Sequence, residues 1–248
     1  MILETNGVEL HFDLIGEGEP LLWLHGFMGA GSDWQYVFPE APDGFQVIAP
    51  DLRGHGGSSN PSDRFLFRDA AEDVRALLRH LGIARVKAIG VSGGGIVLLH
   101  MATAAPDSVS SMVIVSAPPY FPAEARAIQR QMSRSMLTGV ELESMRTRHR
   151  RGDAQISELI AQARAFADSY DDVNFTAPYL GTITAETLIV FGDRDPFYPV
   201  SLAFELRAAI PRSSLWVMPD AGHAPAFGEH AAAFAERALA FLRRPVAR

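Results

Sequence analysis

Short apolar runs alternate with helical patterns along most of the chain. Several runs are apolar at every position, which is typical of strands that are buried on both faces of a sheet. We expect strands at residues 2–5, 8–15, 21–24, 45–50, 85–91, 111–115, 187–191 and 214–218. The helical spacing of apolar residues predicts helices at residues 68–81, 96–102, 200–209 and 229–242. Strands that alternate with helices predict an α/β fold, with a mostly parallel sheet covered by helices on both sides.

The alternation is interrupted once. Residues 118–184 are helical in pattern, are rich in Met and Arg, and contain no convincing strand. We therefore predict a core formed by residues 1–117 and 185–248, with residues 118–184 inserted as a helical cap over one end of the sheet.

Composition and charge narrow the classes of function. The 248 residues fit one large α/β domain with an insertion. A net charge of −7, spread along the chain, argues against a nucleic-acid partner. No apolar run approaches the roughly 20 residues of a membrane span, and the first residues lack the basic and apolar regions of a secretory signal. We therefore expect a cytoplasmic protein.

Missing residue types and motifs exclude some chemistry. The chain contains no cysteine, which rules out disulfides, thiolate nucleophiles and cysteine metal sites. It also has no dinucleotide-binding fingerprint, and no two histidines at ligand spacing on one helix. We expect no metal and no organic cofactor.

One motif joins the strand at 85–91 to the helix that follows it. The pattern Gly-x-Ser-x-Gly spans residues 90–94. Its glycines are needed because a side chain would clash across a tight strand-to-helix turn. Such a turn lifts the hydroxyl of Ser92 out of the sheet and leaves the N–H of Gly93 free to stabilise an oxyanion. Ser92 is therefore a candidate nucleophile, although the pattern also fits a plain glycine-rich turn.

A serine nucleophile needs a base, and the base needs an acid to orient it. His223 is the candidate base, because it follows the last expected strand directly, at the edge where catalytic groups of open α/β sheets collect. Asp195 follows the preceding strand and is the candidate acid, because Pro196 holds its loop extended. Asp193 is the competing acid, which would instead pair locally or cap the turn.

The second oxyanion donor would come from the loop after an earlier strand. The strand at 21–24 ends in His25-Gly26, and the next N–H belongs to Phe27. We predict Phe27 and Gly93 as the two donors. The alternative is another glycine turn, with His25 only bracing the loop.

Five motifs occur in the order that is typical of the α/β-hydrolase superfamily. They are His25-Gly26-Phe27, the loop from Asp51 to Ser58, Gly90-Val91-Ser92-Gly93-Gly94, Gly192-Asp193-Arg194-Asp195 and Gly222-His223. The chain resembles the branch that contains cap-bearing serine esterases, enol-lactonases and C–C hydrolases. This resemblance implies an eight-stranded, mostly parallel sheet with a helical cap, a triad of Ser92, Asp195 and His223, and oxyanion donors at Phe27 and Gly93. Many relatives carry Met, Trp or Gln where this chain has Gly93, so one wall of the pocket would be absent.

The residue type at position 92 narrows the resemblance further. Epoxide hydrolases and haloalkane dehalogenases of similar sequence use an aspartate there and form an alkyl-enzyme. A serine forms an acyl-enzyme, which implies a carbonyl substrate. We predict a serine esterase that cleaves small to medium carboxylic esters.

The insertion is expected to supply much of the substrate pocket. Met28, Tyr120, Met136 and Phe197 are candidate substrate contacts, while most apolar residues of the cap are expected to pack within it.

The insertion is also rich in arginine. Arg126, Arg130 and Arg134 recur at four-residue spacing, which predicts a shared, solvated helix face. The alternative is that one arginine of the insertion binds a substrate carboxylate. His149, in a second basic cluster, is expected to be exposed.

Two other functions remain open. The first is a lactonase or C–C hydrolase of aromatic degradation, which turnover of a lactone or a dienoate would reveal. The second is a receptor-like, ligand-binding protein that retains the triad and shows nearly single-turnover kinetics. The expected partner is a small-molecule ester, and the sequence leaves a homodimer open.

Overall fold

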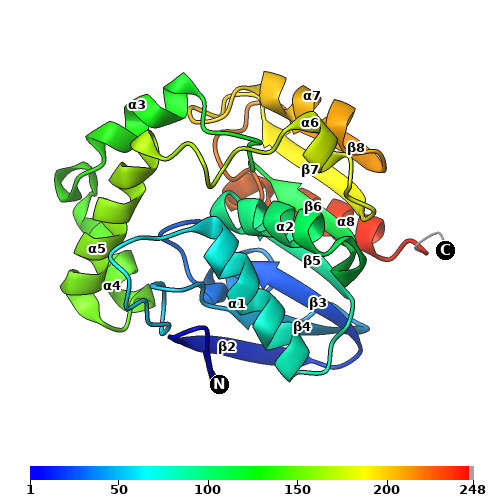
Figure 1. The fold of residues 1–248 in the computed structure, drawn as a ribbon, viewed down its shortest axis with the longest axis horizontal. Coiled ribbons are helices and arrows are strands. Elements are labelled where there is room, and N and C mark those ends of the chain that lie inside the picture. The colour runs from blue at the N-terminus through cyan, green and yellow to red at the C-terminus, as the bar shows by residue number, and fades with distance from the viewer. Residues whose placement is uncertain (246–248) are drawn as a thin grey trace.

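The computed structural model describes residues 1–245, and eight strands within them form one sheet in the order β1-β2-β4-β3-β5-β6-β7-β8 (Figure 1). The pairs β1–β2 and β2–β4 are antiparallel, and the other pairs are parallel. The strands are β1 (Ile2–Thr5), β2 (Val8–Gly16), β3 (Glu19–Leu24), β4 (Phe45–Pro50), β5 (Val86–Val91), β6 (Val109–Val115), β7 (Glu186–Gly192) and β8 (Ser213–Met218). The predicted mostly parallel sheet is confirmed.

Helices connect the parallel strands. The α-helices are α1 (Phe67–His80), α2 (Gly93–Ala104), α3 (Ala123–Gln131), α4 (Gly139–Arg148), α5 (Gly152–Ala165), α6 (Ala177–Leu180), α7 (Val200–Ala209) and α8 (Ala231–Leu242). Short 3-10 helices are η1 (Gly31–Tyr36), η2 (Pro106–Ser108), η3 (Arg134–Met136), η4 (Phe166–Asp168) and η5 (Gly228–His230). The four helices expected in the core correspond to α1, α2, α7 and α8. Within residues 1–245, no helix has both the length and the apolar character that a membrane crossing requires.

Alternate residues of the central strands point to opposite faces of the sheet. In β3, Leu22 and Leu24 pack on the face that α1, α2 and α7 cover, whereas Leu21 and Trp23 pack on the face of α8 and η1. Figure 1 shows α1 and α2 in front of the sheet and α8 behind it. Both faces are buried, which explains why the strands appear in the sequence as continuous apolar runs.

The helical insertion lies between β6 and β7, and its helices α3, α4 and α5 form an arch beside the sheet (Figure 1). The three arginines expected on one solvated face are distributed differently. Arg126 is buried, and its guanidinium donates to the main-chain carbonyls of Phe121 and Ala167. Arg134 lies in η3, beyond the end of α3. The four-residue spacing therefore does not correspond to one continuous helix face.

The carboxyl ends of the parallel strands meet at one edge of the sheet. The loops that follow β3, β5, β7 and β8 at this edge carry Phe27, Ser92, Asp195 and His223. Four residues that are far apart in the sequence are thereby brought to one place.

Candidate active site

Ser92 lies in a strained turn between β5 and α2. Its backbone has φ 49° and ψ −113°, a conformation that L-residues rarely adopt. A Cβ on Gly90 would lie 2.6 Å from the Gly94 carbonyl carbon, and one on Gly94 would lie 2.4 Å from the Leu24 carbonyl oxygen. The two glycines are therefore required by close backbone packing, as the motif predicts.

The structure brings the serine, histidine and aspartate together. Ser92 Oγ lies 2.9 Å from His223 Nε2, and His223 Nδ1 lies 2.8 Å from Asp195 Oδ2. An ionised carboxylate only accepts hydrogen bonds, so the proton of the neutral ring is assigned to Nδ1 and the lone pair of Nε2 faces Ser92. This arrangement allows His223 to accept the hydroxyl proton of Ser92.

The carboxylate of Asp195 is fully buried and is held by the main chain. Its Oδ1 accepts the N–H groups of Phe197 at 2.8 Å and Tyr198 at 3.1 Å. The competing residue, Asp193, is exposed. Of the two aspartates in this loop, Asp195 is therefore the one aimed at His223.

The two candidate oxyanion donors are neighbours. A Cβ on Gly93 would lie 3.0 Å from the backbone nitrogen of Phe27, so the two residues are close in space. Neither N–H has a hydrogen-bond partner within the described residues. Two adjacent, unpaired amides beside Ser92 can stabilise a negatively charged oxygen.

Three buried histidines hold the loop that carries Phe27. His55 Nε2 accepts the N–H of Met28 at 3.1 Å, and His149 Nε2 lies 3.1 Å from the Met28 carbonyl oxygen. The other nitrogen of His149 accepts the N–H of Gly56 at 3.0 Å. His25 Nδ1 lies 2.8 Å from the Gly26 carbonyl oxygen, and its Nε2 accepts a main-chain N–H. The Nδ1 of His55 lies 2.9 Å from the Arg53 carbonyl oxygen. Each ring thus pairs with one main-chain donor and one acceptor, which favours its neutral form.

His149 differs from the sequence-based expectation, because it is only 1% exposed. Burial lowers the pKa of all three rings, to about 4 for His149 and well below the usual range for His55. The partners of His149 lie 93 and 121 positions away in the sequence, so the local basic sequence carried no signal of its burial. This histidine fastens the insertion to the loop of the candidate oxyanion donors.

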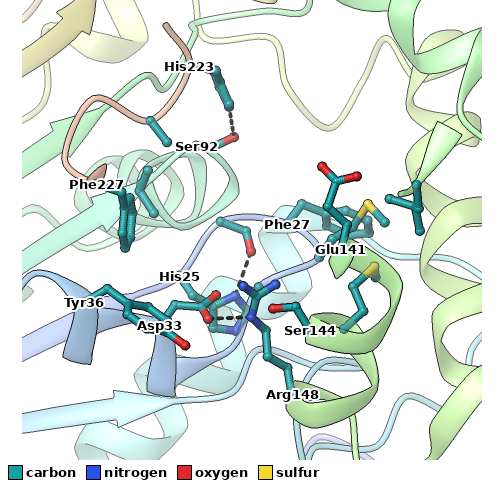
Figure 2. A pocket seen from close by; sticks show the side chains of 17 residues that line it. His25, Phe27, Asp33, Tyr36, Ser92, Glu141, Ser144, Arg148, His223 and Phe227 are labelled. Atoms are coloured by element: carbon teal, nitrogen blue, oxygen red, sulfur yellow. Dashed lines mark hydrogen bonds and ion pairs between the residues drawn. The ribbon is translucent and has the colours of Figure 1, made fainter. Parts of the chain in front are cut away.

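Two cavities meet at Ser92 and His223. The outer cavity, of about 480 Å³, lies between the Phe27 loop and α4. Figure 2 shows its polar wall, where Glu141, Ser144 and Arg148 of α4 lie opposite the pair of Ser92 and His223. The inner cavity, of about 150 Å³, extends from Ser92 toward α3 and is lined mostly by apolar side chains.

Of the four predicted substrate contacts, two line the cavities at Ser92 and two do not. Met28 lines both cavities, and Phe197 lines the inner one. Tyr120 and Met136 line neither. Tyr120 is 37% exposed, with its hydroxyl bonded to Glu205, and Met136 in η3 is 51% exposed. Aromatic or apolar character within the insertion did not reveal which side chains turn inward.

Three residues that sequence patterns did not single out, Tyr198, Arg148 and Gln129, also lie at these cavities. The ring of Tyr198 meets that of His223 edge-on at 5.3 Å, and its hydroxyl is close to Ser92. Burial, and next the charge of Asp195, raise the pKa of Tyr198, so its hydroxyl stays protonated. Arg148 lines the outer cavity and Gln129 the inner one. In the sequence, Tyr198 was marked as a site residue only by its position three residues after Asp195.

Comparisons with known proteins agree with this architecture. A family model described as the alpha/beta hydrolase fold matches residues 19–140. The chain is 41% identical over 110 residues to a soluble epoxide hydrolase of Corynebacterium sp. (strain C12), covering 44% of this chain and 38% of that protein. It is 32% identical over 231 residues to the dihydrolipoyllysine-residue acetyltransferase component of an acetoin cleaving system of Pseudomonas putida, covering 86% of this chain and 60% of that protein. The chain thus spans less than two thirds of the length of each of these two relatives.

A third relative is matched along most of its length. The chain is 28% identical over 248 residues to a pimeloyl-[acyl-carrier protein] methyl ester esterase of Vibrio vulnificus, covering 89% of this chain and 93% of that protein.

Solved structures share the whole fold. A thermophilic esterase from Thermogutta terrifontis has a TM-score of 0.71 and 26% identity, with 91% of this chain and 90% of that chain covered. A meta-cleavage product hydrolase from Pseudomonas fluorescens IP01 has a TM-score of 0.79 and 22% identity, with 97% and 96% covered. The chain thus has the α/β-hydrolase fold.

Proposed function

We propose that this protein hydrolyses carboxylic esters through an acyl-enzyme on Ser92. The observation that carries the proposal is the hydrogen-bonded series Ser92–His223–Asp195 beside the unpaired amides of Phe27 and Gly93. A buried carboxylate, an imidazole and a serine hydroxyl at these distances are the parts that acyl transfer requires.

The proposed reaction has two halves. Ser92 Oγ attacks the ester carbonyl while His223 Nε2 takes its proton, and the N–H groups of Phe27 and Gly93 donate to the carbonyl oxygen as it becomes negative. His223 then returns the proton to the leaving alkoxide, which departs as the alcohol. A water molecule attacks the acyl-enzyme with His223 again as the base, and the acid is released as Ser92 regains its proton.

Two observations support an ester over an epoxide or a haloalkane. The residue in the nucleophile turn is a serine, whose product with a carbonyl compound is an acyl-enzyme. Proteins named as esterases are also among the relatives and solved structures that match at 26–28% identity over most of their length.

A C–C hydrolase is the second candidate. A hydrolase of 2-hydroxy-6-oxononadienedioate from Pseudomonas putida is 29% identical over 255 residues. Such a substrate carries carboxylates, and Arg148 lines the outer cavity. However, Arg148 Nε is already 2.6 Å from Asp33, and Glu141 adds a second acidic group to the same wall. We therefore favour a neutral ester.

The proposal is tested by covalent labelling. An alkyl fluorophosphonate should label the wild-type protein on the peptide that contains Ser92, and hydrolysis of p-nitrophenyl butyrate should stop in parallel. Ser92→Ala should lose the label and reduce turnover by a factor on the order of 10⁶. Ser144→Ala, which removes another hydroxyl of the outer cavity, should retain both. Near wild-type turnover by Ser92→Ala would contradict the proposal.

Slow, single-turnover kinetics of the labelled site would instead favour the receptor-like alternative. Efficient turnover of a dienoate diketone, with no turnover of simple esters, would favour the C–C hydrolase.

A further inference from the structure

The inner cavity is apolar almost throughout. Its lining includes Phe67, Ile96, Phe121, Met132, Phe166 and Phe197. Apart from the reacting groups and Tyr198, the polar side chain in the lining is that of Gln129. In the described part of the chain, no Asp, Glu, Lys or Arg lines this cavity.

Gln129 belongs to the inward face of α3. Ala125, one turn earlier on the same face, is fully buried, and Gln129 is itself only 5% exposed. The buried residues of α3 are Ala125, Arg126 and Gln129, and of these Gln129 is the one that lines the inner cavity.

The amide of Gln129 is unpaired. Its Oε1 is buried without a hydrogen-bond partner, and no hydrogen bond of its amide occurs within residues 1–245. The neighbouring guanidinium of Arg126 donates hydrogen bonds to the carbonyls of Phe121, Phe166 and Ala167. These nearby carbonyls therefore already have a donor and do not depend on the amide of Gln129. A buried amide without a partner is costly, and a bound molecule that supplies the missing hydrogen bond would remove that cost.

We propose that Gln129 recognises a neutral hydrogen-bonding group at the far end of the substrate arm that enters the inner cavity. This inference rests on the ester hydrolysis proposed above and assigns a substrate class to it. The class is an ester whose arm is apolar near the reacting carbonyl and ends in a primary amide, a secondary amide or a hydroxyl. A charged end is disfavoured, because the cavity offers it no counter-ion.

We expect the protein to discriminate strongly between esters that carry this polar end group and esters that lack it. A site that is built to hydrogen-bond its substrate rejects an analogue that lacks the polar group, because the buried side chain is then left unpaired. From the typical cost of one unsatisfied buried group, we expect the wild-type protein to prefer the amide-ended ester over its apolar counterpart by about 10- to 100-fold in kcat/KM.

The test compares pairs of esters that differ only at the end of one arm. One member ends in a carbamoyl group, and the other in an isopropyl group of nearly the same shape. Two series of increasing arm length are used, one with the arm on the acyl side of p-nitrophenyl esters and one with the arm on the alcohol side of butyrate esters. The measured quantity is the ratio of kcat/KM within each pair.

Gln129→Met keeps the length of the side chain and removes both polar atoms. It should reverse or abolish the preference, slowing the amide-ended ester and accelerating the apolar one. Gln131→Met alters an exposed glutamine of the same helix and should leave the ratio unchanged. Because the ratio compares two substrates on one protein, loss of folded protein cancels from it.

The outcomes separate this inference from the proposed function. If the wild-type protein hydrolyses simple esters through Ser92 but shows no preference at any arm length, or if Gln129→Met retains the wild-type ratio, the role of Gln129 is overturned. If neither hydrolysis nor phosphonylation of Ser92 occurs, the proposed function fails, and this inference fails with it.

Discussion

Asp195 uses its two carboxylate oxygens for different partners. Oδ1 accepts two main-chain N–H groups from the loop that follows, while Oδ2 accepts the Nδ1 proton of His223. The main-chain bonds fix the plane of the carboxylate. An asparagine in this position would satisfy the two N–H groups with its amide oxygen and turn its NH₂ toward His223.

We predict that Asp195→Asn lowers kcat for p-nitrophenyl butyrate by about 10⁴, with a much smaller change in KM. The NH₂ group can only donate, so His223 would have to accept at Nδ1 and carry its proton on Nε2, where it can no longer deprotonate Ser92. Steady-state kinetics measure the effect. Asp193→Asn changes the exposed aspartate of the same loop and should remain close to wild type. Equal losses in both variants would contradict the assignment.

Some of these residues could be predicted from the sequence, and others could not. Ser92, Asp195 and His223 each follow a strand that is recognisable by its apolar run, and the order of parallel strands brings their ends together. His149 and Gln129 lie in the insertion, where the surroundings of each side chain depend on how the helices pack against the core. The local sequence around these residues does not indicate how the helices pack.

At the scale of elements, the insertion is fastened to the loop from Arg53 to Ser58. Gln155 of α5 donates to the carbonyls of Gly54 at 2.8 Å and Gly56 at 3.1 Å, and the main-chain N–H of Arg150 also reaches the Gly56 carbonyl. His149 accepts the N–H of Gly56. These bonds connect the polar wall of the outer cavity to the core.

We predict that Gln155→Ala loosens the insertion and destabilises the protein by about 1–3 kcal/mol, because the buried carbonyl of Gly54 loses its donor and that of Gly56 keeps only the N–H of Arg150. Hydrogen exchange should accelerate in α4 and α5 while β5 and β6 remain protected. Gln131→Ala, at an exposed glutamine of α3, serves as the control. Unchanged exchange in α4 and α5 would show that Gln155 does not anchor the insertion.

The strands and the core helices were predictable because their apolar residues follow simple patterns. Strands buried on both faces appear as continuous apolar runs, and the core helices have apolar residues at helical spacing. The helices of the insertion were harder to orient. In α4, Met145 is the one buried residue, and the helix has no continuous apolar stripe to show which side contacts the core. Its contacts are instead made by individual polar side chains such as Arg148, which pairs with Asp33.

For the molecule as a whole, the buried neutral histidines couple stability to pH. In the unfolded chain a histidine takes up its proton near pH 6.5. In the folded protein the pKa of His149 is lowered to about 4, mainly by burial and then by the neighbouring His25 and Arg148. Between these values the unfolded state binds more protons, so the free energy of unfolding falls as the pH decreases from about 6.5 to 4.

We predict that His149 alone accounts for about 3 kcal/mol of this loss. Urea denaturation at a series of pH values would measure it. His149→Gln can retain an acceptor and a donor but does not titrate, so its stability should depend less on pH across that window. His80→Gln, at an exposed histidine of α1, should keep the wild-type pH dependence. If the stability of both variants depends on pH in the same way, His149 does not cause the loss of stability at low pH.

The positive φ of Ser92 implies that the proposed nucleophile is maintained at the expense of the folded state. A backbone held in such a region typically costs about 1–3 kcal/mol. Replacing Ser92 with glycine should therefore yield an inactive protein that is more stable than the Ser92→Ala variant by about 1 kcal/mol, since alanine keeps the strain and glycine relieves it. The difference in melting temperature between these two inactive proteins would measure how much folding stability is lost to hold the Ser92 hydroxyl in this turn.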